Sequence, residues 1–187
     1  MTNTKIIFLR HLKTKKDPNK NAANWYLSKE GQTEAENIAN NPIMQGIDII
    51  YVSSEIKTKL TIEPLNTIIN KKIIIDNRLN EVKRGDKFLS DSEFLLEKEK
   101  QLLDWNYEAF DGEKGEDALK KFKNAIAEIT EKNKGKNVLV VSHGTILNLY
   151  FADLLDEKDN IINRWKNTGF GGYGILENQK LVKDIIN

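Results

Sequence analysis

The sequence contains no cysteine, which excludes a disulfide bond, a thiolate metal site and a cysteine nucleophile. It also lacks an excess of one charge, because 29 Lys and Arg residues stand against 28 Asp and Glu residues. This balance gives no indication of nucleic acid or an anionic membrane surface as a partner. No hydrophobic run reaches membrane-spanning length, and the N-terminus lacks the apolar stretch of a signal peptide. We therefore expect a cytoplasmic protein that binds neither nucleic acid nor a membrane.

Short apolar runs alternate with helical patterns along the chain. Runs without polar alternation, typical of strands covered on both faces, occur at 6–9, 47–52, 72–75 and 138–141. Helical patterns occur at 31–41, 57–70, 89–107, 115–132 and 145–155. The alternation predicts a three-layer α/β fold in which helices cover both faces of a mostly parallel central sheet.

The last third of the chain and one internal segment depart from this alternation. Runs at 171–176 and 180–182 flank a tight turn, which predicts a hairpin and an antiparallel C-terminal edge of the sheet. The segment 86–115 is rich in charge and in large side chains, and we interpret it as a small helical insertion, or cap, over the site. Lys and Glu alternate at 97–100, which favours a solvated helix face without a function. The length predicts a single domain over 1–187.

Histidine is scarce, and both copies follow predicted strands. His11 comes directly after the first strand, and His143 comes directly after the run at 138–141. In α/β sheets, ligands and chemistry gather beyond the carboxyl ends of the strands, so both side chains are expected to reach one crevice. Arg10 precedes His11, and its planar fork can hold two phosphate oxygens at once. With the hydroxyl of Thr14, it predicts an anion site at the end of the first strand.

Five motifs in order resemble those of the histidine phosphatase superfamily, also called phosphoglycerate mutase-like. The family's R-H-G-x-T, L-[ST]-x-x-G-x-x-Q-A, S-S, L-x-E-x-x-x-G and final strand motifs are matched at 10–14, 27–35, 53–62, 79–85 and 140–144. Each motif alone is weak, but their shared order over about residues 6–155 is specific. The resemblance implies a phosphatase for a small phosphorylated substrate, with neither a metal nor another cofactor.

The resemblance also implies a role for each matched residue. His11 attacks phosphorus to form a phosphohistidine that water hydrolyses, and a backbone carbonyl is expected to fix its other ring nitrogen. Glu81 is the general acid for the leaving oxygen, which requires a pKa raised by burial or by nearby phosphate charge. His143 completes the catalytic set. Phosphate binding is assigned to Arg10, Thr14, Lys57, His143 and Gly144.

The sequence departs from the family pattern at several positions. Leu12 replaces the usual glycine, and we expect it to narrow or reshape the entrance. Lys57 keeps the charge of the expected second arginine but loses its fork, and Thr58 is the competing position. Arg84 or Arg78 could reach in to compensate.

Other sequence positions leave two interpretations open. Lys13 replaces a common acidic residue and either meets an anionic substrate or is solvated. Asp17 and Asn19 are equally suited to a position where the family often has asparagine.

Three other functions remain open at this point. A phosphoglycerate mutase type of phosphoryl transfer is the nearest alternative, although the chain is short for the mutases of this family and lacks their usual motif details. A protein phosphohistidine phosphatase is similarly open. A non-catalytic phosphate-binding regulatory module is favoured by the departures at Leu12 and Lys57, and opposed by the presence of His11, Glu81 and His143. No feature of the sequence indicates the substrate or the oligomeric state.

Overall fold

A six-stranded sheet forms the centre of the computed structural model, which describes residues 3–85 and 88–186. The strands are β1 Lys5–Arg10, β2 Ile49–Val52, β3 Ile73–Ile75, β4 Asn137–Ser142, β5 Tyr173–Glu177 and β6 Lys180–Lys183. Their spatial order is β3-β2-β4-β1-β5-β6. The first four are parallel to one another, whereas β5 and β6 pair antiparallel. The predicted mostly parallel sheet with an antiparallel C-terminal edge is confirmed.

Both faces of the central strand β1 are buried. Ile6 and Phe8 belong to one hydrophobic core, and Ile7 and Leu9 belong to the core on the opposite face. Successive side chains of a strand point to opposite faces, so a strand between two helical layers needs an unbroken apolar run. The run at 6–9 therefore follows directly from its place in the middle of the sheet.

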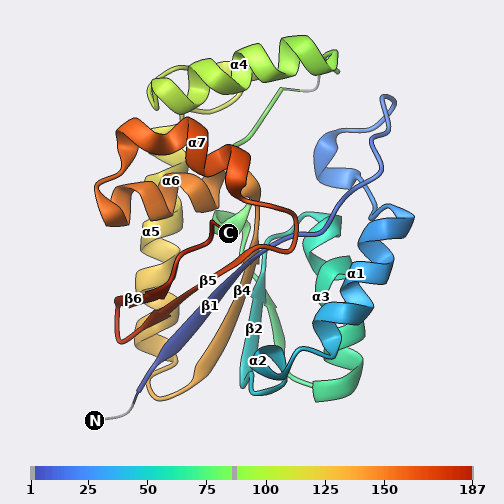
Figure 1. Cartoon of the computed structure of the whole chain (residues 1–187), viewed down its shortest axis with the longest axis vertical. Coiled ribbons are helices and arrows are strands. Elements are labelled where there is room, and N and C mark those ends of the chain that lie inside the picture. Colours follow the sequence, from blue (N-terminus) through green and yellow to red (C-terminus); the bar gives the residue numbers. More distant parts are fainter. Residues whose placement is uncertain (1–2, 86–87, 187) are drawn as a thin grey trace.

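Helices cover both faces of this sheet (Figure 1). On one face lie α1 Lys29–Ala39, α2 Pro42–Gln45 and α3 Ile56–Ile69, which contribute to the core beneath Ile7 and Leu9. On the other lie α5 Gly115–Lys132, α6 Gly144–Leu155 and α7 Ile161–Asn167, which enclose the core around Phe8. The predicted three layers are confirmed.

The predicted insertion forms a cap that lies beyond the carboxyl end of the sheet (Figure 1). Its main element is α4 Asp91–Leu103, which begins with a capping box between Ser90 and Glu93. Two backbone hydrogen bonds close its base, from Gly85 N to Phe110 O at 2.7 Å and from Glu113 N to Lys83 O at 3.1 Å. Residues 86–87, at the start of the predicted insertion, lie outside the described residues.

The structure differs from the predicted helices at the end of α4 and at α7. The predicted helix 89–107 ends at Leu103, because Trp105 turns into the core and its indole nitrogen donates to Leu102 O at 2.9 Å. Helix α7 was not predicted, since it has seven residues and no side-chain cap at its N-terminus. A helix of two turns is too short to display a clear apolar period.

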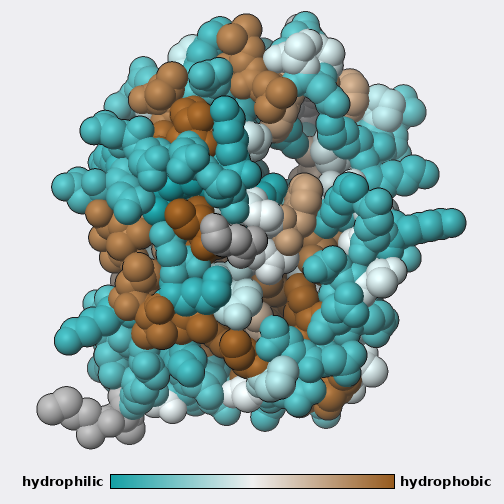
Figure 2. Space-filling model, in the orientation of Figure 1, coloured by the Kyte–Doolittle hydropathy of each residue, from teal (hydrophilic) through white to brown (hydrophobic). Residues whose placement is uncertain are grey.

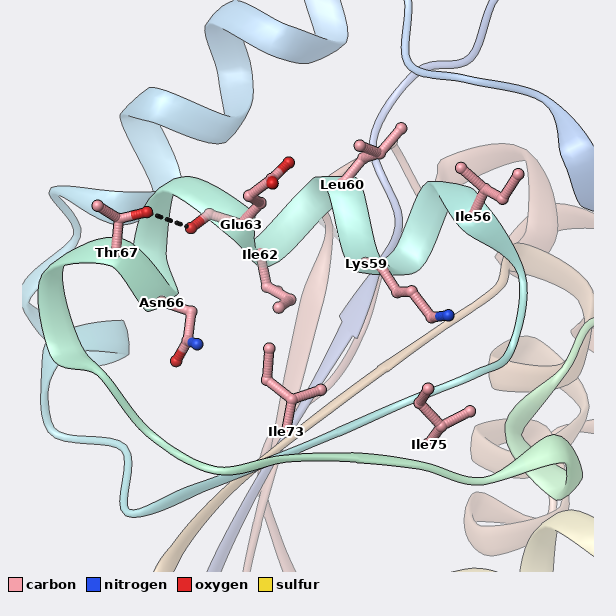
Figure 3. A pocket seen from close by; sticks show the side chains of 9 residues that line it. All are labelled: Ile56, Lys59, Leu60, Ile62, Glu63, Asn66, Thr67, Ile73 and Ile75. Carbon is pink, nitrogen blue, oxygen red and sulfur yellow. Dashed lines mark hydrogen bonds between the residues drawn. The ribbon is translucent and has the colours of Figure 1, made fainter.

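The outer strand β3 borders an apolar hollow against α3 (Figure 3). Ile73 and Ile75 are both exposed there, and Ile56 lies at the helix side of the hollow. In the described part of the chain, no helix combines the length and the hydrophobicity that crossing a membrane requires.

Candidate active site

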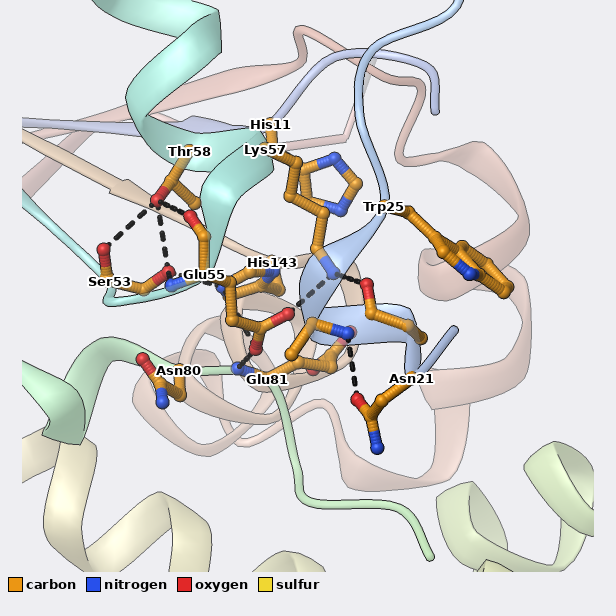
Figure 4. Close-up of polar contacts among 12 residues, drawn as sticks. His11, Asn21, Trp25, Ser53, Glu55, Lys57, Thr58, Asn80, Glu81 and His143 are labelled. Carbon is orange, nitrogen blue, oxygen red and sulfur yellow. Dashed lines mark hydrogen bonds and ion pairs between the residues drawn. The ribbon is translucent and has the colours of Figure 1, made fainter. Parts of the chain in front are cut away.

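The two histidines lie next to each other at the carboxyl ends of two neighbouring strands. His11 follows β1 and His143 follows β4, and these strands pair in parallel with Arg10 opposite Ser142. The ring centroids are 5.1 Å apart. The predicted shared crevice is therefore present (Figure 4).

His11 presents one free ring nitrogen. Its Nδ1 lies 2.8 Å from the carbonyl oxygen of Leu12, as expected, so Nε2 is left without a hydrogen bond among the described residues. Burial lowers the pKa of His11 well below its ordinary value, and the nearby His143 and Lys57 lower it further. The ring is consequently neutral at pH 7, with the Nε2 lone pair available.

His143 is fully buried and is held by a hydroxyl group. Its Nε2 lies 2.7 Å from Ser53 Oγ and 3.4 Å from Glu55 Oε1, while Nδ1 is buried without a hydrogen-bond partner among the described residues. Burial lowers the pKa of His143, although the carboxylate of Glu55 opposes this shift. In the ligand-free protein it is therefore a neutral hydrogen-bonding group and does not supply positive charge.

Arg10 reaches the same space from the end of β1. Its guanidinium donates to the carbonyl oxygen of Thr168 and stacks over Phe170 at 4.2 Å, while Nε has no partner among the described atoms. Burial lowers the pKa of Arg10, although the carboxylate of Glu81 opposes this shift. An arginine side chain keeps its positive charge in proteins. Gly144 makes room for it, because a Cβ there would lie 2.9 Å from the guanidinium carbon and from Nε of Arg10.

Lys57 fills the position that Thr58 contested. Its buried ammonium ion-pairs with Glu55 Oε2 at 2.5 Å and donates to Ala22 O at 2.7 Å (Figure 4). Thr58 instead hydrogen-bonds within the turn, with its hydroxyl 3.0 Å from Ser53 Oγ. Lys57, and not Thr58, therefore brings a positive charge to the site, and the carboxylate of Glu55 neutralises part of that charge.

Glu81 is fixed by backbone N–H groups. Its carboxylate accepts from Thr145 N and Ile146 N at the start of α6, and from Val82 N, each at 3.0 Å. Burial alone would raise the pKa of Glu81, but Lys98, His143 and these N–H groups prevail and lower it to about 2. Burial therefore does not yield a raised pKa for Glu81, whose carboxylate is ionised in this structure, and the expected rise rests on the charge of a bound phosphate.

The segment that carries Glu81 is anchored to two strand ends. Asn80 Oδ1 accepts from Ser54 N at 2.9 Å, and Ser142 Oγ donates to Leu79 O at 2.7 Å. Glu81 N in turn donates to Glu55 Oε1 at 2.9 Å. These bonds join the two carboxylates and His143 into one buried polar unit.

Sequence reasoning missed Glu55 and Lys98. Lys98, on α4, is only 2% exposed, and its ammonium donates to Gln101 Oε1 at 2.6 Å and to Thr145 Oγ1 at 2.9 Å. Burial lowers the pKa of Lys98 to about 8, although Glu81 opposes this shift. The prediction of a solvated helix face is wrong at this residue. It holds for Lys100, which is exposed and pairs with Glu97 at 2.9 Å.

These groups line a cavity of about 750 Å³ between the cap and the sheet, and Figure 2 shows the hollow on this face of the molecule. All seven predicted site residues line it: Arg10, His11, Thr14, Lys57, Glu81, His143 and Gly144. Of the lining residues that the structure describes, nine are Lys or Arg and four are Asp or Glu. The cavity is therefore cationic although the whole chain is almost neutral, and it suits an anionic ligand.

Leu12 and Lys13, which depart from the family pattern, have different surroundings. Leu12 is fully buried against Leu27 and Ala35 and does not line the cavity, so the expectation that it narrows the entrance is wrong. Lys13 lines the cavity but pairs with Glu30.

Of the two arginines that could compensate for Lys57, one lines the cavity and the other does not. Arg84 lines the cavity, whereas Arg78 lies elsewhere and pairs with Asp76 and Glu128. Asn21 lines the cavity in place of Asp17 or Asn19. Within residues 3–85 and 88–186, no three His, Asp or Glu side chains are grouped so that they could hold a metal ion.

The fold is similar to several solved structures. Bacillus stearothermophilus YhfR is 20% identical, with a TM-score of 0.82 and coverage of 98% of each chain. A mycobacterial glucosyl-3-phosphoglycerate phosphatase is 18% identical, with a TM-score of 0.76 and coverage of 94% of this chain and 90% of that one. An Entamoeba histolytica phosphoserine phosphatase, solved as a mutant with phosphoserine, is 20% identical, with a TM-score of 0.74 and coverage of 92% and 89%.

The family itself is shown by sequence. No curated protein sequence matches this chain. The model of the histidine phosphatase superfamily (branch 1) matches residues 6–180, which is nearly the whole chain. The chain therefore belongs to the histidine phosphatase superfamily, branch 1.

Proposed function

We propose that this protein hydrolyses phosphate monoesters through a phosphohistidine on His11. The observation that carries the proposal is the free Nε2 of a neutral His11 at the wall of a cationic cavity. A neutral imidazole is a nucleophile at pH 7, and Arg10 and Lys57 beside it can stabilise the charge on the phosphoryl oxygens. The names of two similar structures, glucosyl-3-phosphoglycerate phosphatase and phosphoserine phosphatase, support a phosphatase.

The proposed reaction has two steps. In the first, the Nε2 lone pair of His11 forms a bond to phosphorus while the ester P–O bond breaks, and the leaving oxygen takes a proton from Glu81. In the second, water attacks phosphorus, the P–N bond breaks, and the proton of the water returns to Glu81. The products are an alcohol, inorganic phosphate and the starting enzyme. The buried Nδ1 of His143 is the donor that we assign to a phosphoryl oxygen.

Glu81 needs a proton for the first step, although its pKa is about 2 in the ligand-free site. A phosphoryl dianion bound beside the carboxylate repels its negative charge and raises its pKa, because like charges disfavour a second ionisation. The acid is therefore formed by substrate binding. Leaving groups that are stable as anions do not need this proton.

The direct test is the covalent intermediate. Rapid mixing with substrate, followed by quenching in base and mass spectrometry, is expected to find an acid-labile phosphoryl group on His11, absent from His11→Ala. Glu81→Gln is expected to lose far more activity on alkyl phosphates than on p-nitrophenyl phosphate. A protein without turnover on any monoester, and without a phosphoenzyme, would instead be a phosphate-binding module.

A further inference from the structure

Arg84 is the arginine of the cavity that the proposed chemistry does not use. It follows Glu81 by three residues and forms no ion pair among the residues that the structure describes. Its guanidinium lies 5.1 Å from the ring centre of Phe94 and 5.8 Å from those of Phe110 and Trp25. Rings attract a guanidinium toward their faces, and the N–H edges of a guanidinium can bind a planar anion at two points.

Two of the three rings around Arg84, those of Phe94 and Phe110, belong to the cap. Phe94 lies on α4, and Phe110 stacks on it with a centroid distance of 5.4 Å. Phe110 takes φ 60° and Asp111 takes φ 51°, in the left-handed region that non-glycine residues rarely adopt. Gly85 N donates to Phe110 O at 2.7 Å, which fixes this turn beside Arg84. The backbone is thus held in an uncommon conformation that places Phe110 at the cavity.

The surroundings of Arg84 separate it from the phosphoryl position. Arg10 stands at the end of β1, whereas the rings beside Arg84 include those of Phe94 and Phe110 in the cap. Arg84 also follows Glu81, the proposed acid for the leaving oxygen, by three residues. The leaving group therefore lies on the side of Arg84.

The lining residues carry more positive charge than a phosphate monoester alone would neutralise. Five of the lining lysines pair with carboxylates: Lys57 with Glu55, Lys16 with Asp91, Lys121 with Glu113, Lys13 with Glu30 and Lys20 with Asp17. Among the described lining residues, four further cations, Arg10, Lys83, Arg84 and Lys98, form no ion pair, and Glu81 is the one acidic residue outside the pairs. This surplus of three positive charges exceeds a phosphate monoester dianion, which carries about two negative charges, by one.

We propose that Arg84 binds a carboxylate on the leaving group, so that the preferred substrates are phosphate monoesters of hydroxy acids. This inference rests on the proposed phosphatase function. A carboxylate close to the ester oxygen binds the N–H edges of Arg84 while the phosphoryl group contacts Arg10, Lys57 and His11. Substrates without the carboxylate leave the Arg84 edges unpaired in a partly desolvated place, which costs affinity for the transition state.

Phosphoserine and phosphoethanolamine test the inference, because they differ only by the carboxylate. The wild-type protein is expected to show kcat/KM at least about tenfold higher for phosphoserine, the effect of one hydrogen-bonded charge pair. Equal kcat/KM for the two esters would overturn the inference and leave the phosphatase function standing. No turnover on either ester or on p-nitrophenyl phosphate, with no phosphoenzyme, would overturn both.

Variants then assign the preference to Arg84. In Arg84→Gln the ratio of the two kcat/KM values is expected to fall to within about threefold of one, and Arg84→Lys, which keeps the charge but loses the fork, is expected to lie between. Arg78→Gln is the matched control, because Arg78 pairs with Asp76 and Glu128 outside the cavity, and it keeps the wild-type ratio. A ratio is read only from folded variants, judged by an unchanged unfolding transition. A wild-type ratio in both folded Arg84 variants would contradict the assignment.

Discussion

Glu55 forms an ion pair with Lys57, the lysine that we expect to bind phosphate. Its carboxylate is 2.5 Å from the Lys57 ammonium, so a phosphoryl group must compete with it. Glu55→Gln removes the charge but keeps an oxygen that can accept from Glu81 N. We expect inorganic phosphate to inhibit this variant about threefold to tenfold more tightly at pH 7, since an opposing charge has been removed. The measurement is the inhibition constant of phosphate, with the exposed Glu63→Gln on the same helix as control. Weaker inhibition would show that Glu55 is needed to hold Lys57 in place.

The carboxylate of Glu81 makes the stability of the fold depend on pH. Its folded pKa of about 2 lies below the ordinary value of 4.5, so its carboxylate stabilises the fold above about pH 4.5, and this contribution is lost as the pH falls toward 2. We expect Glu81→Gln to lower the free energy of unfolding at pH 7 by about 3 kcal/mol at most, and the difference from wild type to shrink as the pH falls below 4.5. Denaturant unfolding at pH 7, 4 and 3 measures this, with the exposed Glu99→Gln as control. A difference independent of pH would contradict the assigned pKa.

At the residue scale, the sequence could predict the groups that follow strands and not those that reach in from elsewhere. His11, Arg10 and His143 were predictable, because the end of a buried strand fixes where the next residues lie. Lys98 was not, because its neighbours alternate in charge as on a solvated helix, and only the docking of α4 buries it. Glu55 was not either, since its role depends on the approach of Lys57 and Glu81 from different segments.

Gly144, at the start of α6, leaves space for the side chain of Arg10. A Cβ at Gly144 would lie 2.9 Å from the Arg10 guanidinium, a flexible group that can move away from Thr168 O. Gly144→Ala is therefore expected to change the stability by no more than about 1 kcal/mol, and to lower kcat/KM about tenfold or more by displacing a phosphate ligand. Steady-state kinetics and thermal unfolding test both parts. Gly46→Ala is the control, because the nearest atom to its Cβ is 3.9 Å away. Unchanged kinetics would mean that Arg10 does not need this position.

At the element scale, long periodic segments were predicted better than turns and short helices. Helix α5 spans the predicted 115–132, because its apolar face repeats over five turns. The side on which Leu12 points could not be read from the sequence, since it depends on the space beside Leu27 and Ala35. Gly171 completes that space, because its Cβ would lie 2.9 Å from Leu12 Cδ2. The substitution of the family's glycine is thus absorbed by the core, away from the cavity.

At the scale of the whole molecule, charge is unevenly placed. The chain has a net charge of +1, yet the cavity lining within residues 3–85 and 88–186 holds nine Lys and Arg residues and four acidic residues. Attraction of an anionic substrate must therefore come from the cavity and not from the overall charge. Salt screens such attraction, with a Debye length of about 10 Å at 0.1 M. We expect kcat/KM for p-nitrophenyl phosphate to fall about threefold to tenfold as NaCl rises from about 20 to about 500 mM.

Two lysines separate this local field from general surface charge. Lys83 lines the cavity and is exposed, whereas Lys134 does not line it and pairs with Glu131. Both Lys83→Glu and Lys134→Glu change the net charge by the same two units, so an effect of the overall charge would appear equally in both. Because the field of the cavity acts over only about a Debye length, Lys83→Glu is expected to flatten the dependence of kcat/KM on salt, and Lys134→Glu is expected to leave it as in the wild type. Equal salt dependence in the two variants would show that substrate attraction does not arise in the cavity.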